Sequence, residues 1–377
     1  TYVVEDQNSL TWFVYDGAPI PFSPWKFSEI CKTPTESLLE ETTHIITPDK
    51  QQDFVRLQCP EGTTYFYLMN SDGTKIQQLG ESLTKPSQAT DMKWSSDGSH
   101  VLVTLASNKG TELYRFDIQK MLNDPAIQPI QLATDSVMIY GAVWQPIVNN
   151  DIVEEKPTPE PTQTSNDLVA FMAETNLATN NNTDIYTMRM DGSAVTNLTH
   201  DPAKDFNAND YNPAWSPDKK QIAFISDRGG NSTGNIDIFV MNPDGSNQTR
   251  LTNNPGLDDF LAWSPDGKRI AYFSSPLDEF YATGQLIIMN SDGSNKTVIT
   301  QEPGYYYFQG WSPDGQKIIF GKPRLVGNRF KDIGIYIVDI DGKNQHEWFV
   351  GNFDQLHWED SEHFLGIVQT GTDTQPQ

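Results

Sequence analysis

The chain has 377 residues, and 26 lysines and arginines against 50 aspartates and glutamates give a formal net charge of −24 at pH 7. This balance argues against nucleic acid and anionic membrane surfaces as partners, because both are bound through clustered lysine and arginine. The sequence has no run of about 18 apolar residues, so it predicts no membrane insertion. Frequent glycine (26) and proline (24), with 11% aromatic residues, favour many short strands joined by turns.

The N-terminal segment contains the first of two cysteines, Cys31 and Cys59. Two thiols allow neither a disulfide framework nor a thiolate zinc site. They form either one disulfide bridge, as in an exported protein, or two buried free thiols. The acidic composition, rich in Gln, Asn and Thr, favours the bridge and export.

A repeat of about 48 residues organises the rest of the chain. Its copies start at Ile46, Trp94, Trp144, Trp215, Trp263, Trp311 and Trp358. Three copies match closely, as WSPDKKQIAFIS, WSPDGKRIAYFS and WSPDGQKIIFGK show. The spacings between starts are 48, 50, 71, 48, 48 and 47 residues, so one repeat carries an insertion.

Each repeat predicts four strands. The first ends at the Trp, and Ser-Pro-Asp-Gly then forms a turn, because Pro fixes φ and Gly accepts a positive φ. In the repeat of Trp263, residues 269–273 form the second strand, residues 286–289 the third, and residues 297–300 the fourth. The third strand ends in an Asp-Gly hairpin turn. Such sheets must stack to bury both faces, and a ring protects their edges, so the sequence predicts an all-β chain with a β-propeller fold.

Seven repeat starts predict seven four-stranded blades. The last blade would take its inner strands from residues 353–369 and its outer strands from residues near 10–30, so that the N- and C-terminal strands close the ring. On this division residues 1–43 complete the last blade and residues 44–377 form the propeller. The alternative is six blades, with residues 1–60 as an extension. The 46-to-94 spacing equals the repeat period and favours seven.

The long spacing after Trp144 contains residues 147–166, including Lys156-Pro157-Thr158-Pro159-Glu160-Pro161-Thr162. Alternating proline and polar residues favour extended, unpaired backbone. We therefore expect a disordered Pro-rich insertion between the first two strands of this repeat.

The motifs WSPDGxxIAF and IYxMNxDGSxxxxLT resemble the TolB-type propeller repeat, a WD-like repeat, over residues 44–368. The resemblance implies export to the bacterial periplasm or the cell exterior, and binding of proteins or peptides through a propeller face. TolB itself has six blades and a preceding α/β domain, which is not evident here, because residues 1–40 are too few and too Pro-rich. Similar repeats occur in tricorn-like and prolyl-oligopeptidase-like peptidases beside a hydrolase domain that is not evident here.

The residues just before each repeat start are the candidate binding residues, because propeller geometry places them at the mouth of the central channel. We call the residues three and four positions before each start the rim residues. Those four before are Thr42, Thr90, Tyr140, Tyr211, Asp259, Tyr307 and Asp354; those three before are Thr43, Asp91, Gly141, Asn212, Phe260, Phe308 and Gln355. Unlike the repeated Trp, which fits core packing, they differ from repeat to repeat.

We expect the ligand-binding residues to be Tyr140, Tyr211, Asn212, Asp259, Phe260, Tyr307, Phe308, Asp91 and Asp354. Flat aromatic rings with carboxylates and amides suit a sugar, or a peptide with basic groups. The neighbouring residues Asp205, Asp210, Asp258 and Tyr305-Tyr306 would add to this pocket. The alternative is an ordinary polar channel that holds water or an incidental Ca²⁺ or Na⁺.

Catalytic and metal-binding arrangements are not predicted. The sequence has no Gly-x-Ser-x-Gly and no His-Glu-x-x-His. Its six histidines are scattered, and His357 and His363 alone make a weak metal site. The repeated Asp residues lack the alternating spacing of a calcium loop and suit turns instead. No resident cofactor or metal is therefore expected.

The sequence thus favours a monomeric, exported, non-catalytic scaffold that binds a protein segment, peptide or glycan at the channel mouth. A polysaccharide-acting hydrolase or lyase of propeller type is one alternative. A structural spacer in a cell-surface assembly is the other.

Overall fold

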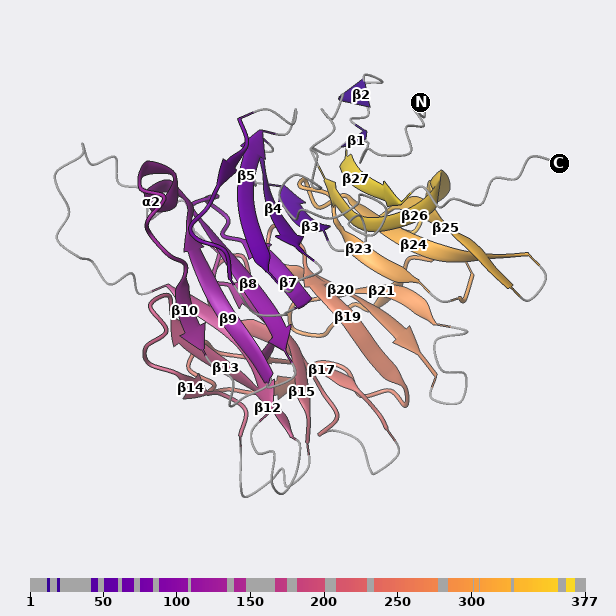
Figure 1. The fold of residues 1–377 in the computed structure, drawn as a ribbon. Helices are drawn as coiled ribbons and strands as arrows, with labels where there is room; N and C mark the ends of the chain where they lie inside the picture. Colours follow the sequence, from indigo (N-terminus) through magenta and orange to yellow (C-terminus); the bar gives the residue numbers. More distant parts are fainter. Residues whose placement is uncertain are drawn as a thin grey trace. The chain divides into compact units, whose positions relative to one another are not determined.

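The structure is a computed structural model, and the residues that it describes are 12–13, 19–20, 42–46, 51–59, 63–70, 75–83, 88–107, 110–133, 139–146, 167–174, 182–200, 208–228, 234–276, 284–300, 302–304, 306–326, 329–358 and 364–369. The chain divides into two compact units. The N-terminal unit comprises Phe22–Ile222 and Met241–Asn247, and the C-terminal unit comprises Thr1–Pro21, Ala223–Val240 and Gln248–Gln377. Strands dominate both units (Figure 1), as the sequence predicts.

Three four-stranded antiparallel sheets belong to the N-terminal unit. The first has the order β3-β4-β5-β6: β3 (Thr42–Ile46), β4 (Gln52–Gln58), β5 (Thr64–Asn70) and β6 (Gln77–Gln78). The second has the order β10-β9-β8-β7: β7 (Gln88–Trp94), β8 (His100–Ser107), β9 (Gly110–Asp117) and β10 (Ile130–Ala133). The third has the order β11-β12-β13-β14: β11 (Ile139–Trp144), β12 (Leu168–Glu174), β13 (Thr183–Arg189) and β14 (Thr196–Asn197).

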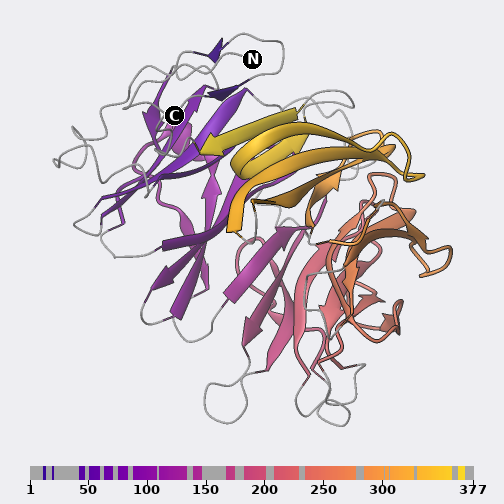
Figure 2. The same cartoon turned by 90° about the vertical axis from the view of Figure 1, so that its right-hand side faces the viewer.

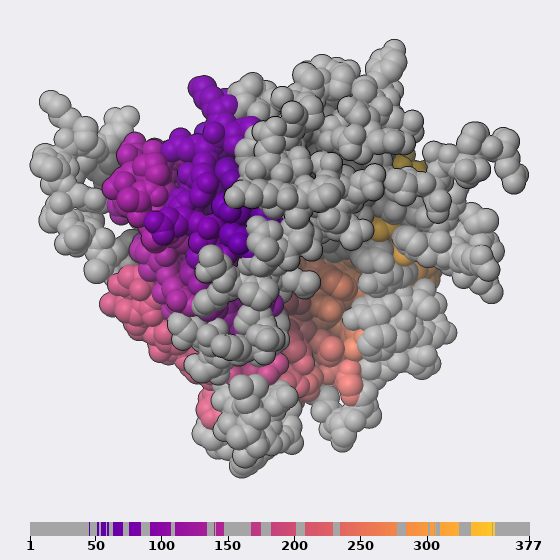
Figure 3. All heavy atoms as spheres, in the orientation of Figure 1, coloured from indigo at the N-terminus to yellow at the C-terminus, as the bar shows by residue number. Residues whose placement is uncertain are grey.

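A short helix, α2 (Ile118–Asn123), follows β9 where other repeats have their Asp-Gly turn. Asp117 caps it, because its side chain accepts a hydrogen bond from the Lys120 backbone N–H. Ile118 and Met121 are buried against the sheet, while Figure 3 shows the helix at the surface of the unit. The helix therefore replaces a hairpin without disturbing the four-stranded sheet.

The C-terminal unit contains two sheets. One has the order β19-β20-β21-β22: β19 (Leu257–Trp263), β20 (Arg269–Ser275), β21 (Gln285–Asn290) and β22 (Thr297–Val298). The other has the order β2-β1-β27-β26-β25-β24-β23: β1 (Trp12–Phe13), β2 (Pro19–Ile20), β23 (Tyr307–Trp311), β24 (Lys317–Val326), β25 (Arg329–Asp339), β26 (His346–Trp358) and β27 (Phe364–Gln369). A further sheet, β15 (Asp210–Trp215), β16 (Ile222–Ser226), β17 (Asp237–Met241) and β18 (Thr249–Arg250), has strands in both units.

The described residues thus form six sheets, where the sequence predicts seven blades. The difference arises at β26, a single strand of 13 residues. Its first half pairs with β25, as at Ile333 and Gly351, and its second half pairs with β27, as at His357 and Leu365. The repeats of Trp311 and Trp358 are therefore continuous in one seven-stranded sheet, whose long strands appear in gold and yellow in Figure 2.

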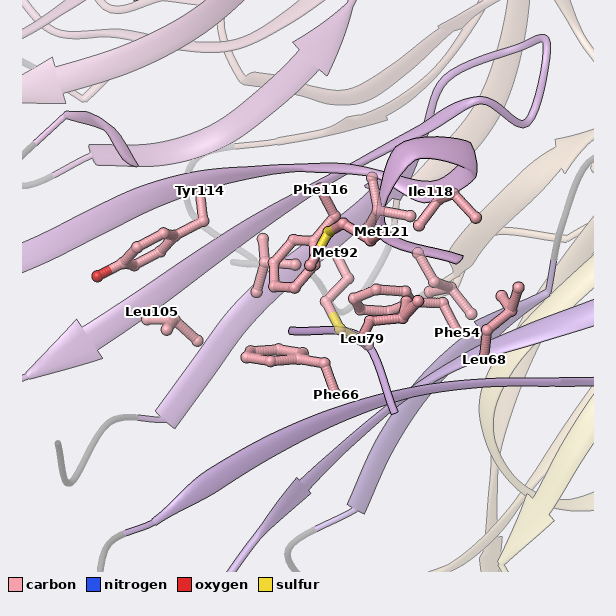
Figure 4. Packing of buried hydrophobic residues seen from close by; sticks show 13 residues of the cluster. Phe54, Phe66, Leu68, Leu79, Met92, Leu105, Tyr114, Phe116, Ile118 and Met121 are labelled. Atoms are coloured by element: carbon pink, nitrogen blue, oxygen red, sulfur yellow. The ribbon is translucent and has the colours of Figure 1, made fainter. Parts of the chain in front are cut away.

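Aromatic side chains fill the core between the first two sheets of the N-terminal unit (Figure 4). Phe54 of β4 lies 5.1 Å from Phe116 of β9 between ring centroids, and Phe66 of β5 lies 4.6 Å from Phe116. All three are at most 1% exposed. Burying each contributes about 1.5–3 kcal/mol, so the stacking of neighbouring sheets is a main source of stability.

The repeated tryptophans end the first strands, as predicted, and join successive repeats. Trp94 Nε1 donates to the Ile45 carbonyl over 3.1 Å, Trp144 Nε1 to the Lys93 carbonyl over 2.9 Å, and Trp311 Nε1 to the Ala262 carbonyl over 3.1 Å. The acceptor is in each case the residue just before the preceding start. Trp215 differs, because its buried Nε1 has no partner among the described residues.

The turn after each tryptophan uses the repeated Asp as a hydrogen-bond acceptor. In the repeat of Trp263, the Ser264 hydroxyl donates to Asp266 Oδ1 over 2.6 Å, and the Lys268 N–H donates to the same oxygen over 3.1 Å. The Ser264 hydroxyl also lowers the pKa of Asp266. This use of the carboxylate supports the prediction that these Asp residues are turn residues.

The glycine of the Asp-Gly hairpins is required by two features. Gly192, Gly245, Gly293 and Gly342 have φ between +78° and +83°. They also lie against the backbone of the preceding repeat: a Cβ on Gly245 would lie 2.8 Å from the Leu198 carbonyl oxygen. Only glycine provides both the left-handed backbone and this close approach.

We expect Gly245→Ala to lower the free energy of unfolding by about 1–3 kcal/mol, because it combines a strained φ with a backbone clash. Ala194 gives the opposite test, since it is exposed and already has φ +54°. Ala194→Gly should leave the protein as stable or slightly more stable. Guanidinium unfolding of both variants checks this pair, and equal losses from the two substitutions would contradict it.

Several predictions concern residues outside the described ranges. The Pro-rich insertion at residues 147–166, most of residues 1–43, and Cys31 all lie there. Cys59 is described, buried and disulfide-bonded, and Cys31 is the one other cysteine of the sequence.

Candidate functional site

The candidate rim residues lie on the first strands of their repeats: β3, β7, β11, β15, β19, β23 and β26. Asp91, Tyr211, Asn212, Asp259 and Phe260 have described side chains. The side chains of Tyr140, Tyr307, Phe308 and Asp354 lie outside the described part of the structure, although their backbones belong to the strands.

A β-bulge interrupts the pairing of first and second strands at the rim. The register shifts lie between Ala89 and Asp91, Tyr140 and Val143, Asp259 and Ala262, Phe308 and Gly310, and Phe353 and Leu356. A bulge bends its strand and re-aims a side chain, and bulges are common beside functional sites. The rim is therefore a recurring break in the ladder of these five repeats, whereas β3 and β4 pair through Thr42 and Thr43 without a bulge.

The residue three positions before the start adopts a left-handed backbone in three successive repeats. The φ values are +55° at Gly141, +49° at Asn212 and +54° at Phe260. Glycine and asparagine accept this conformation, whereas a bulky aromatic residue seldom does. Because such strain concentrates at functional sites, its presence at Phe260 marks the rim as more than a strand end.

The described rim side chains are in different surroundings. Asn212 is exposed, whereas Tyr211 and Asp259 are half-buried. Asp91 forms an ion pair of 3.4 Å with Lys93. Asp259 Oδ1 accepts the Phe260 N–H over 2.6 Å, which holds the left-handed turn.

Phe260 has a second role that the sequence did not indicate. Its half-buried ring packs edge-on against Phe273, with 6.4 Å between ring centroids, at the margin of the core cluster around Trp311. Phe260 therefore contributes to the core as well as to the rim.

The aspartates five positions before the start do not face solvent. From the sequence, Asp210 and Asp258 are expected to add to the pocket, but they are 1% and 0% exposed. Tyr306, at the same position in the next repeat, is 1% exposed. This position therefore faces the sheets, and the expectation that these three residues widen the pocket is wrong. Simple alternation counted back from the Trp does not indicate this burial, because the bulge lies between this position and the Trp.

A buried polar network surrounds Asp258 and Asp237, both 0% exposed. Arg250 Nη2 lies 2.5 Å from Asp237 Oδ2, and Asn235 Nδ2 donates to the same oxygen over 2.7 Å. Asn254 Nδ2 donates to Asp258 Oδ1 over 3.2 Å, while Asp258 Oδ2 has no partner among the described residues. The network ties the start of β19 to the preceding hairpin.

Burial raises the pKa of both carboxyl groups. For Asp258, desolvation is opposed by the hydroxyls of Ser274 and Thr252 and by the Asn254 amide. For Asp237, desolvation outweighs the Arg250 charge. Both carboxyl groups thus lie close to the rim, in surroundings that favour their protonated form.

A serine, a histidine and an aspartate lie in line at the turn after Trp94. His100 Nδ1 lies 2.6 Å from Ser99 Oγ, and His100 Nε2 lies 3.7 Å from Asp117 Oδ2. Ser99 Oγ also lies 2.7 Å from both oxygens of Asp97, the turn aspartate. Asp97 also accepts the Ser99 backbone N–H over 3.0 Å and the Ser95 hydroxyl over 2.6 Å, as the turn aspartates of other repeats do. The arrangement is therefore the repeat's turn with one added hydroxyl contact.

Within the described ranges, no group of three or more His, Cys, Asp or Glu residues could hold a metal ion. His363 and the side chain of His357 lie outside these ranges. No helix among the described residues is long and apolar enough to cross a membrane.

No protein-family model and no curated protein matches this chain. Among solved structures, oligogalacturonate lyase from Vibrio parahaemolyticus is 15% identical, with 82% of this chain and 77% of that chain covered and a TM-score of 0.56. The β-propeller domain of the Trilobed protease from Pyrococcus furiosus is 11% identical, with 81% and 83% covered and a TM-score of 0.52. The chain has a β-propeller fold. The predicted all-β architecture of mainly antiparallel four-stranded sheets is thereby confirmed.

The structures similar to this chain also include a TolB protein from Agrobacterium tumefaciens. It is 21% identical, with 81% of this chain and 91% of that chain covered, at a TM-score of 0.47. Sequence identities this low show similarity of fold alone, because the β-propeller fold occurs in both a lyase and a protease among these structures.

Proposed function

We propose that this propeller is a non-catalytic binding scaffold and that its rim residues hold a basic segment of a partner protein. One observation carries the proposal: the bulge and the left-handed residue recur at one position, while Gly141, Asn212 and Phe260 differ there in chemistry. A backbone conformation that recurs in three successive repeats with changing side chains suits recognition on a repeat scaffold.

Charge favours a basic partner. The chain carries −24, and two described rim residues, Asp91 and Asp259, are carboxylates. A cationic segment would be attracted at long range and then paired at the rim. An oligogalacturonate, the substrate named for one similar structure, is a polyanion and would be repelled.

We further propose seven blades over residues 44–377, closed by the termini. The second half of β26 with β27 would supply the inner strands of the last blade. Phe13 of β1 pairs with Gly366 of β27, and β1 pairs with β2, which supports outer strands taken from residues 1–43.

We also propose that the protein is exported. The disulfide at Cys59 supports this, because such bonds persist in oxidising compartments.

The experiment is a paired array of basic, neutral and acidic peptides and of glycans, probed with the purified chain. We expect basic peptides to bind. The triple variant Tyr211→Ala, Asp259→Asn, Tyr307→Ala should lose that binding while keeping its unfolding midpoint, because the amide keeps the acceptor for the Phe260 N–H. Unchanged binding by the folded triple variant would refute the proposal. Binding of glycans alone would refute the statement that the partner is a basic protein segment.

A charge-matched pair sharpens the test. Asp259→Asn removes one rim charge and keeps the Oδ1 acceptor for Phe260, whereas Asp292→Asn removes one exposed hairpin charge and keeps the acceptor for Ser294. Asp259→Asn should weaken binding of the selected peptide by about tenfold or more. Asp292→Asn should leave the affinity unchanged. Equal losses of affinity in the two variants would show that Asp259 acts only through long-range electrostatic attraction and not through a contact at the rim.

A further inference from the structure

Two strands of the seven-stranded sheet continue beyond it as a two-stranded ribbon. β24 has 10 residues and β25 has 11, whereas the second and third strands of the four-stranded sheets have five to eight. β23 pairs with β24 only as far as Gly321, and β26 pairs with β25 only from Ile333 onward. Beyond these residues β24 and β25 pair with each other alone among the described strands.

We call residues 322–326 and 329–332 the ribbon. In Figures 1 and 2 the ends of β24 and β25 extend away from the other strands of their sheet. The root is fixed to the C-terminal unit, because Lys322 Nζ lies 3.9 Å from Glu302 Oε2 and 5.8 Å from the ring centroid of Tyr306. From this root the ribbon continues for five residues of β24, which is about 17 Å.

The charge of this segment is opposite to that of the chain. Residues 322–331 contain four basic residues, Lys322, Arg324, Arg329 and Lys331, and no acidic one. The rest of the chain carries 22 basic and 50 acidic residues, a formal charge of −28. Asp332, which pairs with Arg324, is the one acidic residue of the ribbon. The ribbon is therefore a basic segment on an acidic protein.

Apolar residues occupy the last pairs of the ribbon. Leu325 pairs with Phe330, and Val326 pairs with Arg329, next to the connecting residues 327 and 328. The ribbon has no third described strand, so no neighbour in the sheet explains three large apolar residues at its end. Apolar residues flanked by lysine and arginine are typical of segments that enter the headgroup region of a bilayer.

The length of the ribbon separates its charge from the charge of the rest of the chain. The Debye length is about 8 Å at physiological ionic strength, so about 17 Å corresponds to about two Debye lengths. Repulsion between the acidic part of the chain and an anionic surface is then largely screened when the ribbon touches that surface. The net charge of −24 argues against an anionic membrane for the chain as a whole, but it does not exclude contact through the ribbon.

We propose that the ribbon binds the surface of anionic phospholipid bilayers. Its last two residue pairs enter the headgroup region, and its basic residues pair with lipid phosphates. A bilayer accepts a projecting apolar end without a pocket of matching shape, which favours lipid over an acidic protein as the partner. This inference does not depend on the proposed function, because that function belongs to the rim.

The first test is cosedimentation of the intact chain with vesicles. One set contains phosphatidylglycerol and phosphatidylcholine in equal parts, and the other contains phosphatidylcholine alone. We expect binding to the anionic vesicles only. Because each basic residue near such a surface contributes about fivefold, Arg324→Gln with Arg329→Gln should lower the partition coefficient about thirtyfold. No binding to the anionic vesicles, or equal binding to both sets, would overturn the proposal.

The charge control is Lys220→Gln with Lys343→Gln, which changes the net charge by the same amount. These two side chains are 80% and 77% exposed and belong to turns outside the ribbon. This control should bind the anionic vesicles as the wild-type chain does. An equal loss in the control and in the ribbon variant would show that net charge alone is responsible, and would overturn the assignment to the ribbon.

The second test removes the apolar residues. Leu325→Ser with Phe330→Ser should lower the partition coefficient about tenfold or more. Val195→Ser with Val298→Ser is the control, because these valines are 57% and 44% exposed outside the ribbon, and it should bind as the wild-type chain does. All variants should keep the wild-type unfolding midpoint. If the folded Leu325 and Phe330 variant binds normally while the arginine variant does not, charge alone suffices, and an acidic protein replaces the bilayer as the partner.

Discussion

Trp311→Ala is expected to lower the free energy of unfolding by about 3–5 kcal/mol. The indole is 8% exposed and packs with Ile318 and Phe320 in one core cluster. The substitution removes that packing, the Nε1 hydrogen bond to the Ala262 carbonyl, and the partner of Arg269. Denaturant unfolding of the purified variant measures the loss.

Trp311→Phe is the matched control, since it keeps most of the apolar ring and removes the indole N–H. It should cost clearly less, with about 1 kcal/mol assigned to the hydrogen bond between repeats. A loss below about 1 kcal/mol for Trp311→Ala would contradict the role of the repeated Trp in joining repeats.

The second large effect is expected from Arg250→Ala, at about 3–5 kcal/mol near neutral pH. Arg250 is the cation paired with Asp237, which is 0% exposed. Without it, the carboxylate keeps the Asn235 amide and the Thr252 hydroxyl but no opposite charge at bonding distance among the described residues. An unpaired buried charge is among the costliest single defects.

The sign of the pH dependence follows from Asp237. Desolvation already raises its pKa, against the Arg250 charge, and removal of Arg250 would raise the pKa further. A raised folded pKa gives stability that is present below the unfolded value and lost as pH rises through the folded value. The deficit of Arg250→Ala should therefore be largest at neutral pH and shrink toward pH 4.

Adding Asp237→Asn to Arg250→Ala separates charge from packing. The double variant should recover part of the lost stability at neutral pH, because no charge is then buried. A double variant less stable than Arg250→Ala alone would show that the ion pair is not the source of the loss.

The repeat made much of the fold predictable. Trp94, Trp144, Trp215, Trp263 and Trp311 each end a first strand where the sequence places it. The turns were also predictable, because the Ser-Pro-Asp-Gly sequence is typical of a turn in which the Ser264 hydroxyl donates to Asp266. Turn formation depends on residues that are close in sequence, so one amino-acid sequence is enough to predict it.

What the sequence could not supply depends on neighbours in space. Nothing in Asp258-Asp259 distinguishes the buried carboxylate from the rim carboxylate, because a bulge changes the alternation of side chains between them and the Trp. The left-handed backbone at Phe260 contradicts the preference of that residue type. The continuity of β26 across two repeats is likewise visible only in its pairing.

The most direct test of the account measures two quantities on one set of variants: the unfolding midpoint, and the affinity for the basic peptide selected on the array. Trp311→Ala should shift the midpoint, Asp259→Asn should shift the affinity alone, and Asp292→Asn should shift neither. If Asp259→Asn lowered the midpoint while the peptide bound as tightly as before, the rim would be part of the architecture and the proposed division between shared framework and variable recognition would be wrong.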